Sequence, residues 1–182
     1  RRHTRLRTVT GVQTCALPIY CVYAVWVGAG TGSTNLWFSE SRDGGETWLP
    51  PSGSSNDGYQ ATKLSAYIPG LASAKSPSLA WFDDRLYISY LNTNDQLALS
   101  SWDPLSGDAT QWSTPTVLSS DGSSSFTSTL SPQLISNGDG LAITWVAADG
   151  TLASTLSTSP DTTIWTAVDA AAGGGTSPFN PA

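Results

Sequence analysis

The chain has 182 residues, with 14 Asp or Glu against 8 Lys or Arg, so its formal net charge is −6. This length suits one domain or part of a larger one, and 8 Trp, 6 Tyr and 4 Phe provide enough apolar side chains for a core. The acidic balance argues against a nucleic-acid partner, which needs clustered Lys and Arg, and without a run of about 18 apolar residues we expect no membrane insertion.

Residues 1–19 differ in charge from the rest of the chain. They contain four Arg residues, the single His and no acid, as a transit peptide or a basic arm would. The stretch 12–19, VQTCALPI, closely resembles the peptide that results when a short-read sequencing adapter is translated by mistake. We therefore expect residues 1–19 to be a non-native, disordered leader and the folded part to span 20–182. Cys21 then lacks a cysteine partner, which excludes a disulfide framework.

Three hydrophobic stretches in the remainder align without gaps, and each has an aromatic residue at its fifth position. They are VYAVWV at 22–27, LYISYL at 86–91 and LAITWV at 141–146. Their β-branched and aromatic content is typical of buried strands. A polar turn follows each stretch, and a second expected strand then begins at Leu36, Leu97 or Leu152.

Two further markers recur with these stretches. A Trp lies downstream of each, at 48, 112 and 165, and Ser-Pro pairs stand at 76–77, 131–132 and 177–178. Four short strands in each period of roughly 40–50 residues are typical of a β-propeller blade. A sandwich of hairpins would not require self-similar strands in a fixed order.

We therefore predict an all-β fold, a partial β-propeller of four-stranded antiparallel blades. The blades are expected at about residues 20–50, 76–118 and 131–168, with the start of a further blade at 177. The first blade is expected to lack its opening strand, which leaves about two and a half blades. Because these cannot close a ring and would expose strand edges, we expect a fragment of a six- or seven-bladed parent.

One motif is specific. Residues 41–48 read Ser-Arg-Asp-Gly-Gly-Glu-Thr-Trp, and we call them the box. Asp43 can accept backbone N–H bonds across a tight turn, and Gly45 permits the positive φ that such a turn needs. Ser41 and Thr47 add hydroxyl groups, and Trp48 adds a large ring that can be buried.

The box resembles the Asp-box, or bacterial neuraminidase repeat, of the sialidase-like β-propeller family. The resemblance implies that the box is a structural turn between the third and fourth strands, on the face opposite the ligand site. It argues against Asp43 and Glu46 as a glycosidase carboxylate pair. Eroded copies of the box follow Ser101 and Ser157.

The same resemblance places glycan binding on the face built from the turns between second and third strands and from the crossovers between blades. The candidate ligand-binding residues there are Asp57, Tyr59, Lys63 and Tyr67 in the first crossover and Asn92 and Asp95 in a turn. Their aromatic rings can stack on sugars while amide and carboxyl groups bind hydroxyls. The alternative, that they hold a long loop to the rim, stays open.

The family's enzymes hold a substrate carboxylate with three arginines and use a Tyr nucleophile with a Glu partner and an acidic Asp. This chain has no Arg in its expected ligand-face loops, and its Glu residues, Glu40 and Glu46, adjoin the box. No catalytic residue is therefore assigned. No cofactor and no metal site are expected, because the sequence has no phosphate-binding loop, no dinucleotide motif and no His or Cys cluster.

The resemblance thus implies a fragment, non-catalytic as given, of a propeller whose parent recognises sialylated or other glycans. Low Lys and high Ser/Thr content suit a secreted or cell-surface protein. Two alternatives stay open. The parent is an exo-sialidase or related propeller glycoside hydrolase whose catalytic residues lie in the missing blades, or it is a protein-interaction scaffold. The missing blades themselves are expected packing partners.

Overall fold

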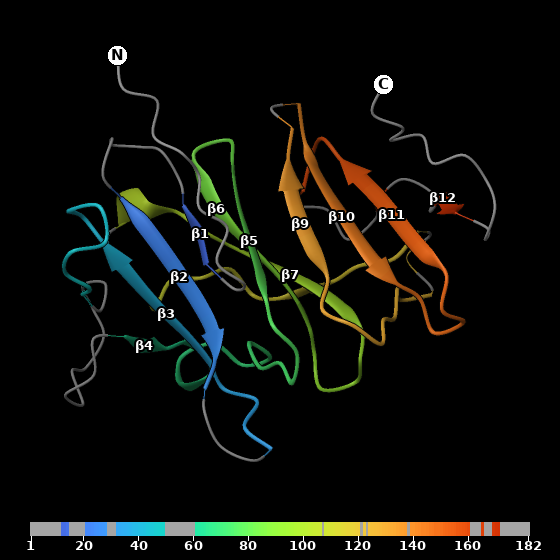
Figure 1. Ribbon diagram of the computed structural model, residues 1–182, viewed down its shortest axis with the longest axis horizontal. Coiled ribbons are helices and arrows are strands. Elements are labelled where there is room, and N and C mark those ends of the chain that lie inside the picture. Colours follow the sequence, from blue (N-terminus) through green and yellow to red (C-terminus); the bar gives the residue numbers. More distant parts are fainter. Residues whose placement is uncertain are drawn as a thin grey trace.

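A computed structural model describes residues 12–14, 21–28, 32–49, 61–106, 108–120, 122, 124–137, 139–160, 165 and 169–171. The fold is all-β, with three four-stranded antiparallel sheets (Figure 1). We call these sheets the first, second and third blades. Among the described residues, no helix has the length and apolar character needed to cross a membrane.

Each blade is a meander of consecutive strands. The first contains β1 (Val12–Thr14), β2 (Val22–Val27), β3 (Leu36–Ser41) and β4 (Thr62–Lys63). The second contains β5 (Ser78–Phe82), β6 (Arg85–Leu91), β7 (Leu97–Trp102) and β8 (Thr116–Val117). The third contains β9 (Gln133–Ser136), β10 (Leu141–Val146), β11 (Leu152–Ser157) and β12 (Asp169–Ala171). Two short 3-10 turns, η1 (Leu64–Ala66) and η2 (Pro104–Ser106), follow β4 and β7.

The central strands of each blade lie where the hydrophobic stretches predict them. β2, β6 and β10 match the three aligned stretches, and β3, β7 and β11 begin at Leu36, Leu97 and Leu152. The fourth strands differ from the prediction. β8 and β12 begin after Trp112 and Trp165, so these Trp residues precede the outer strands instead of lying within them.

The first blade has an opening strand, where the sequence predicted none. β1 pairs antiparallel with β2, with Val12 opposite Ala24 and Thr14 opposite Val22. The physical reason is that the edge of β2 offers unpaired N–H and C=O groups, with which an extended segment can pair through its backbone alone. The described chain therefore has three four-stranded blades in place of two and a half. The non-native origin of residues 1–19 stays a prediction.

The opening strands β1, β5 and β9 lie next to one another, as adjacent blades require. The Leu134 N–H of β9 donates to Ser78 Oγ of β5 at 3.0 Å, so a buried hydrogen bond joins the second and third blades. Two apolar clusters fill the spaces between blades, one between the first and second and one between the second and third. Because the second blade is covered on both faces, every residue of β7 is buried.

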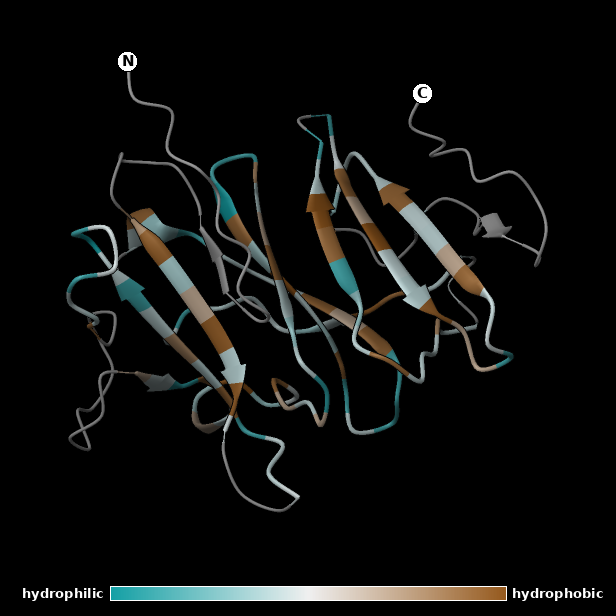
Figure 2. Ribbon diagram, in the orientation of Figure 1, coloured by the Kyte–Doolittle hydropathy of each residue, from teal (hydrophilic) through white to brown (hydrophobic). Residues whose placement is uncertain are grey.

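The turns divide between two opposite edges of the blades (Figure 1). The upper edge, which we call the box edge, carries the box and the β5–β6 and β9–β10 turns. The lower edge, the crossover edge, carries the β2–β3, β6–β7 and β10–β11 turns. Figure 2 shows hydrophobic residues along the strands and mostly hydrophilic residues in these turns. The sites below are therefore built on loops held by a packed β scaffold.

Candidate functional site

The box is closed by hydrogen bonds to one carboxylate. Thr47 donates to Asp43 through its backbone N–H, at 2.8 Å from Oδ1, and through its hydroxyl, at 2.5 Å from Oδ2. The Ser41 hydroxyl also donates to Asp43 Oδ1, at 2.8 Å, and accepts the Gly45 N–H at 2.7 Å. Gly45 has φ +100°, which an L side chain rarely adopts. Every strong contact of Asp43 is thus internal to the turn.

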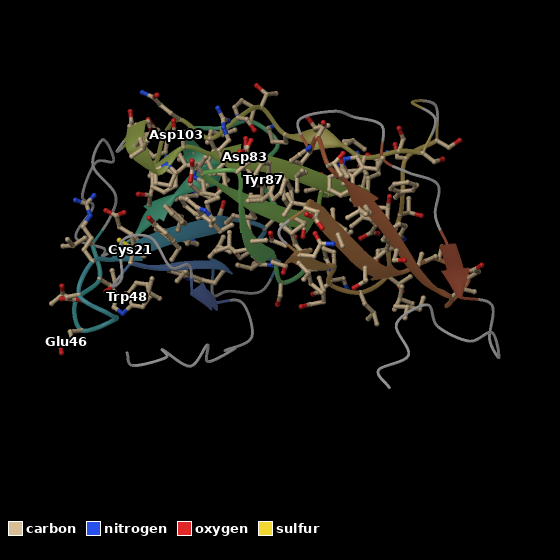
Figure 3. The ribbon with its side chains drawn as sticks, turned by 90° about the horizontal axis from the view of Figure 1, so that it is seen from above. Cys21, Glu46, Trp48, Asp83, Tyr87 and Asp103 are labelled. Atoms are coloured by element: carbon tan, nitrogen blue, oxygen red, sulfur yellow. The ribbon has the colours of Figure 1, made fainter. Side chains whose placement is uncertain are left out.

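These bonds set the ionisation of Asp43. They lower its pKa to about 2, with the Thr47 hydroxyl the largest cause, followed by the Thr47 N–H and the Ser41 hydroxyl. Such a carboxyl group is charged at neutral pH, so it is poorly suited to donate a proton as a general acid. Figure 3 shows Glu46 and Trp48 at the outer end of the first blade. The geometry gives Asp43 a turn-forming role.

Glu40 is engaged just before the box. Its carboxylate is 2.7 Å from Arg42 Nη2 and accepts from Arg42 Nε at 3.0 Å, and its side chain is only 6% exposed. Its backbone also pairs with Leu49, which closes the hairpin around the box. Arg42, in the box, and Arg85, at the start of β6, both lie at the box edge.

Two shorter carboxylate turns, with Asp and Thr two residues apart, lie in the other blades. Asp108 Oδ1 accepts the N–H and hydroxyl of Thr110 at 2.8 and 2.7 Å. Asp149 Oδ1 accepts the same groups of Thr151 at 3.0 and 2.7 Å. In both cases the Thr hydroxyl bond is the main cause of a lowered pKa of the Asp carboxyl. The pattern Asp-x-Thr is the signal that predicts these turns.

A second repeated turn leads into the opening strands. Ser73 accepts the N–H of Lys75 and donates to its carbonyl, at 3.2 and 2.8 Å. Ser128 makes the same two bonds with Leu130, also at 3.2 and 2.8 Å. A Ser-Pro pair follows both turns, so the recurring pattern is Ser-x-x-Ser-Pro. The first Ser of this pattern forms the turn, and the sequence analysis used only the Ser-Pro pair that follows it.

The sequence-predicted ligand residues fall into two groups. Asp57 and Tyr59 lie outside the described residues. Lys63 lies in β4 and is half-buried, and Tyr67 follows η1 with 41% of its surface exposed. Asn92 and Asp95 lie in the β6–β7 turn, at the crossover edge.

The side chains of Asn92 and Asp95 differ in their hydrogen bonds and their exposure. Asn92 Oδ1 accepts the N–H groups of Asn94 and Gln96, at 2.9 and 3.0 Å, and Asn92 Nδ2 donates to Gln96 Oε1. The Asn92 amide therefore closes its own turn. Asp95 has φ +57° and an exposed side chain, and its carbonyl accepts the N–H of Ser128 at 3.0 Å. That bond fixes the second crossover to the turn.

The crossover that carries Tyr67 is anchored at several points. The Ser73 N–H donates to the Thr34 carbonyl at 2.8 Å, and the Tyr90 hydroxyl donates to the Gly70 carbonyl at 2.7 Å. Burial raises the pKa of the Tyr90 phenol well above its ordinary value, so this group stays neutral and acts as a structural donor. Tyr67 therefore lies on a loop that these hydrogen bonds fix to the blades. Among the described residues, no group of His, Cys, Asp and Glu is placed to hold a metal ion.

Comparison with solved structures identifies a similar fold. The chain matches a structure of NanB plus Optactamide with a TM-score of 0.53 and 14% identity, covering 87% of this chain and 23% of that one. It also matches the GH43 endo-arabinanase from Bacillus licheniformis with a TM-score of 0.34 and 15% identity, covering 81% of this chain and 70% of that one. No protein-family model and no curated protein matches the sequence. The likeness to NanB shows the fold, and the chain spans under a quarter of that protein's length.

Proposed function

We propose that the chain is part of a sialidase-like β-propeller whose parent protein binds glycans at the crossover edge. The observation that carries this proposal is the complete box, Ser41 to Trp48, closed around Asp43 within three blades of a propeller fold. The box is the most specific feature of the sequence, and its hydrogen bonds give it the turn-forming role that the Asp-box resemblance implies. A secreted or cell-surface location is part of the proposal, because it gives access to glycans.

In this proposal the chain as given is non-catalytic. A sialidase-like site needs guanidinium groups that face the substrate carboxylate. Among the described residues, Arg42 is paired with Glu40, and Arg85 contacts Ser101 at the box edge, away from the proposed site. Glu40 is buried in its ion pair, so it is not available as the partner of a Tyr nucleophile.

Sugar binding would use the exposed groups of the crossover edge. Tyr67 offers an aromatic surface on an anchored loop, and a ring of this kind combines an apolar face with a polar tip. The Asp95 carboxylate is acceptor-only, which suits paired sugar hydroxyls. Lys63, Asp57 and Tyr59 belong to the same crossover by sequence.

The alternative is a propeller glycoside hydrolase whose catalytic residues lie in further blades. The resemblance of the fold to propeller glycoside hydrolases favours it. The two candidates are separated by the full-length reading frame, recovered from source DNA. Three arginines in crossover-edge loops of further blades would favour the hydrolase, and their absence would favour a glycan-binding module.

A glycan array with the chain as given tests the proposal. We expect retention of at least one glycan, and the Tyr67→Ala and Asp95→Asn variants should each bind it about tenfold less tightly. Leu105→Ala is the matched control, because Leu105 is 90% exposed at the box edge. Binding that is absent, or that Leu105→Ala weakens as much as Tyr67→Ala, would refute the assignment to the crossover edge.

A further inference from the structure

The two interfaces between blades can be compared position by position, because β2–β3 and β6–β7 pair in the same register. Tyr23 stands opposite Glu40 in the first blade, as Tyr87 stands opposite Ser101 in the second. Phe38 of β3 likewise corresponds to Leu99 of β7. Tyr23 and Phe38 belong to the apolar cluster between the first and second blades, and Tyr87 and Leu99 belong to the cluster between the second and third.

The first interface is filled by aromatic rings. Trp102 of the second blade lies with its ring centre 5.2 Å from that of Phe38 and 5.9 Å from that of Tyr23. It also stacks on Trp112 at 6.0 Å. All four rings are buried, so aromatic side chains make up the centre of this interface.

The second interface lacks two of these rings. Trp102 stands opposite Leu86 in the second blade, and the corresponding residue opposite Leu141 in the third blade is Ser157. Leu99 replaces Phe38. A cavity of about 310 Å³ is lined by Tyr87 and Leu99 of the second blade and by Pro160, which follows β11. Figure 3 labels Tyr87 and Asp83, which mark this end of the second blade.

The cavity has both apolar and polar lining residues. The apolar ones are Tyr87, Leu99 and Pro160. The polar ones are Arg85 and five Ser or Thr residues, at positions 100, 101, 113, 114 and 116. Convergent polar groups against an apolar lining are typical of small-molecule sites, and the volume falls at the lower end of their usual range, about 300–1,000 Å³.

Arg85 lines this cavity and is the exposed first residue of β6. Arg85 Nη1 donates to Ser101 Oγ at 3.2 Å, and no carboxylate among the described residues forms an ion pair with Arg85. In the first interface the position of Ser101 is held by Glu40, whose carboxylate pairs with Arg42. At the position of Glu40 the second interface therefore has a serine hydroxyl, which accepts from the guanidinium group of Arg85 on the neighbouring strand.

We propose that this cavity binds a small ring compound with one carboxylate group. The carboxylate pairs with Arg85 through two parallel N–H donors, as guanidinium geometry favours, and the ring packs against Tyr87 and Leu99. Asp83 and Asp84 directly precede Arg85, and their charge disfavours doubly charged anions such as phosphate. The site lies at the box edge and does not depend on the proposed glycan function.

Calorimetric titration with matched pairs tests the proposal. Glucuronate is compared with glucose, and benzoate with benzyl alcohol, so that the two arms separate a sugar acid from an aromatic acid. We expect at least one acid to bind ten times more tightly than its neutral partner. Replacing Arg85 by Gln should remove that preference, whereas Leu105→Ala, at an exposed position outside the cavity lining, should leave it unchanged.

Ser101 allows a sharper test. Ser101→Glu places a carboxylate of the chain beside Arg85, as Glu40 lies beside Arg42, and should weaken acid binding at least tenfold. Ser101→Gln has similar size without the charge and should stay within threefold of the unmodified chain. Circular dichroism checks that each variant folds. If Ser101→Glu does not fold, the acid preference of the Arg85→Gln variant tests the proposal instead. Equal binding of acid and neutral partner in both arms, or equal loss in the Glu and Gln variants, would overturn the proposal.

Discussion

Trp102 should contribute more to stability than any surface residue of the chain. It is 1% exposed, contacts Tyr23, Phe38 and Trp112, and donates its ring N–H to the Asp108 carbonyl at 2.8 Å. Truncating a buried Trp to Ala costs about 3–5 kcal/mol, and the lost hydrogen bond adds about 1 kcal/mol. Trp102→Ala should therefore lower the free energy of unfolding by about 4–6 kcal/mol, which is most of the stability of a marginal domain.

Urea unfolding followed by far-ultraviolet circular dichroism measures this loss without relying on the fluorescence of the deleted ring. Trp102→Phe keeps an aromatic ring but loses the N–H donor, and should cost about 1–2 kcal/mol. Leu105→Ala, at an exposed position, should stay within about 0.5 kcal/mol of the unmodified chain. If Trp102→Ala lowers the free energy of unfolding by less than about 1.5 kcal/mol, the packing of the aromatic rings does not hold the first two blades together.

The remaining predictions concern the box, hydrolytic activity and residues 1–19. The Asp43 carboxyl should titrate in the folded chain near pH 2 by NMR, so its contribution to stability is complete above pH 3.8 and is lost as the pH falls towards 2. Thr47→Val should raise that midpoint towards 3.8, because the Thr47 hydroxyl is the largest cause of the shift, and an unchanged midpoint would contradict this cause. Gly45→Ala should cost about 1–2 kcal/mol in urea unfolding, because Gly45 has a positive φ, whereas Glu46→Ala at an exposed position should cost under about 0.5 kcal/mol. The chain as given should not hydrolyse a fluorogenic sialic-acid substrate, and measurable turnover would show that a catalytic set is present. Deleting residues 1–19 should lower the melting temperature by less than about 4 °C, because β1 pairs over three residues only, and a larger drop would make β1 an integral strand.

The sequence predicted the central strands because their signal is local and repeated. β2, β6 and β10 each combine β-branched and aromatic residues, and three aligned copies remove the ambiguity of a single short run. The outer strands β4 and β8 have only two residues each. Their pairing depends on what lies beside them, so a pattern within the strand cannot identify them.

The box was predictable for the same reason. The partners of Asp43 lie within four residues of it, so turn chemistry alone indicates the contacts. The Tyr90 bond to Gly70 spans 20 residues, and the Ser78 bond to Leu134 spans 56. Such contacts follow from the packing of blades and crossovers. The sequence around Tyr90 or Ser78 therefore does not indicate which distant residue each will bind. The part of the candidate site that lies in residues 50–60 remains a sequence-based prediction.

The two interfaces between blades have the same strand register but different side chains at matching positions. A chain selected only for packing would repeat the Trp102 ring in the next blade, because a filled interface is worth several kcal/mol. Ser157, at the position equivalent to Trp102, lacks that ring. Ser101, at the position equivalent to Glu40, lacks the carboxylate that pairs with Arg42. Ser101 lines the cavity together with Arg85, whereas Ser157 is not among the lining residues. The departure at Ser101 is therefore the one that the proposed ligand would use, and the Ser101 variants test that explanation.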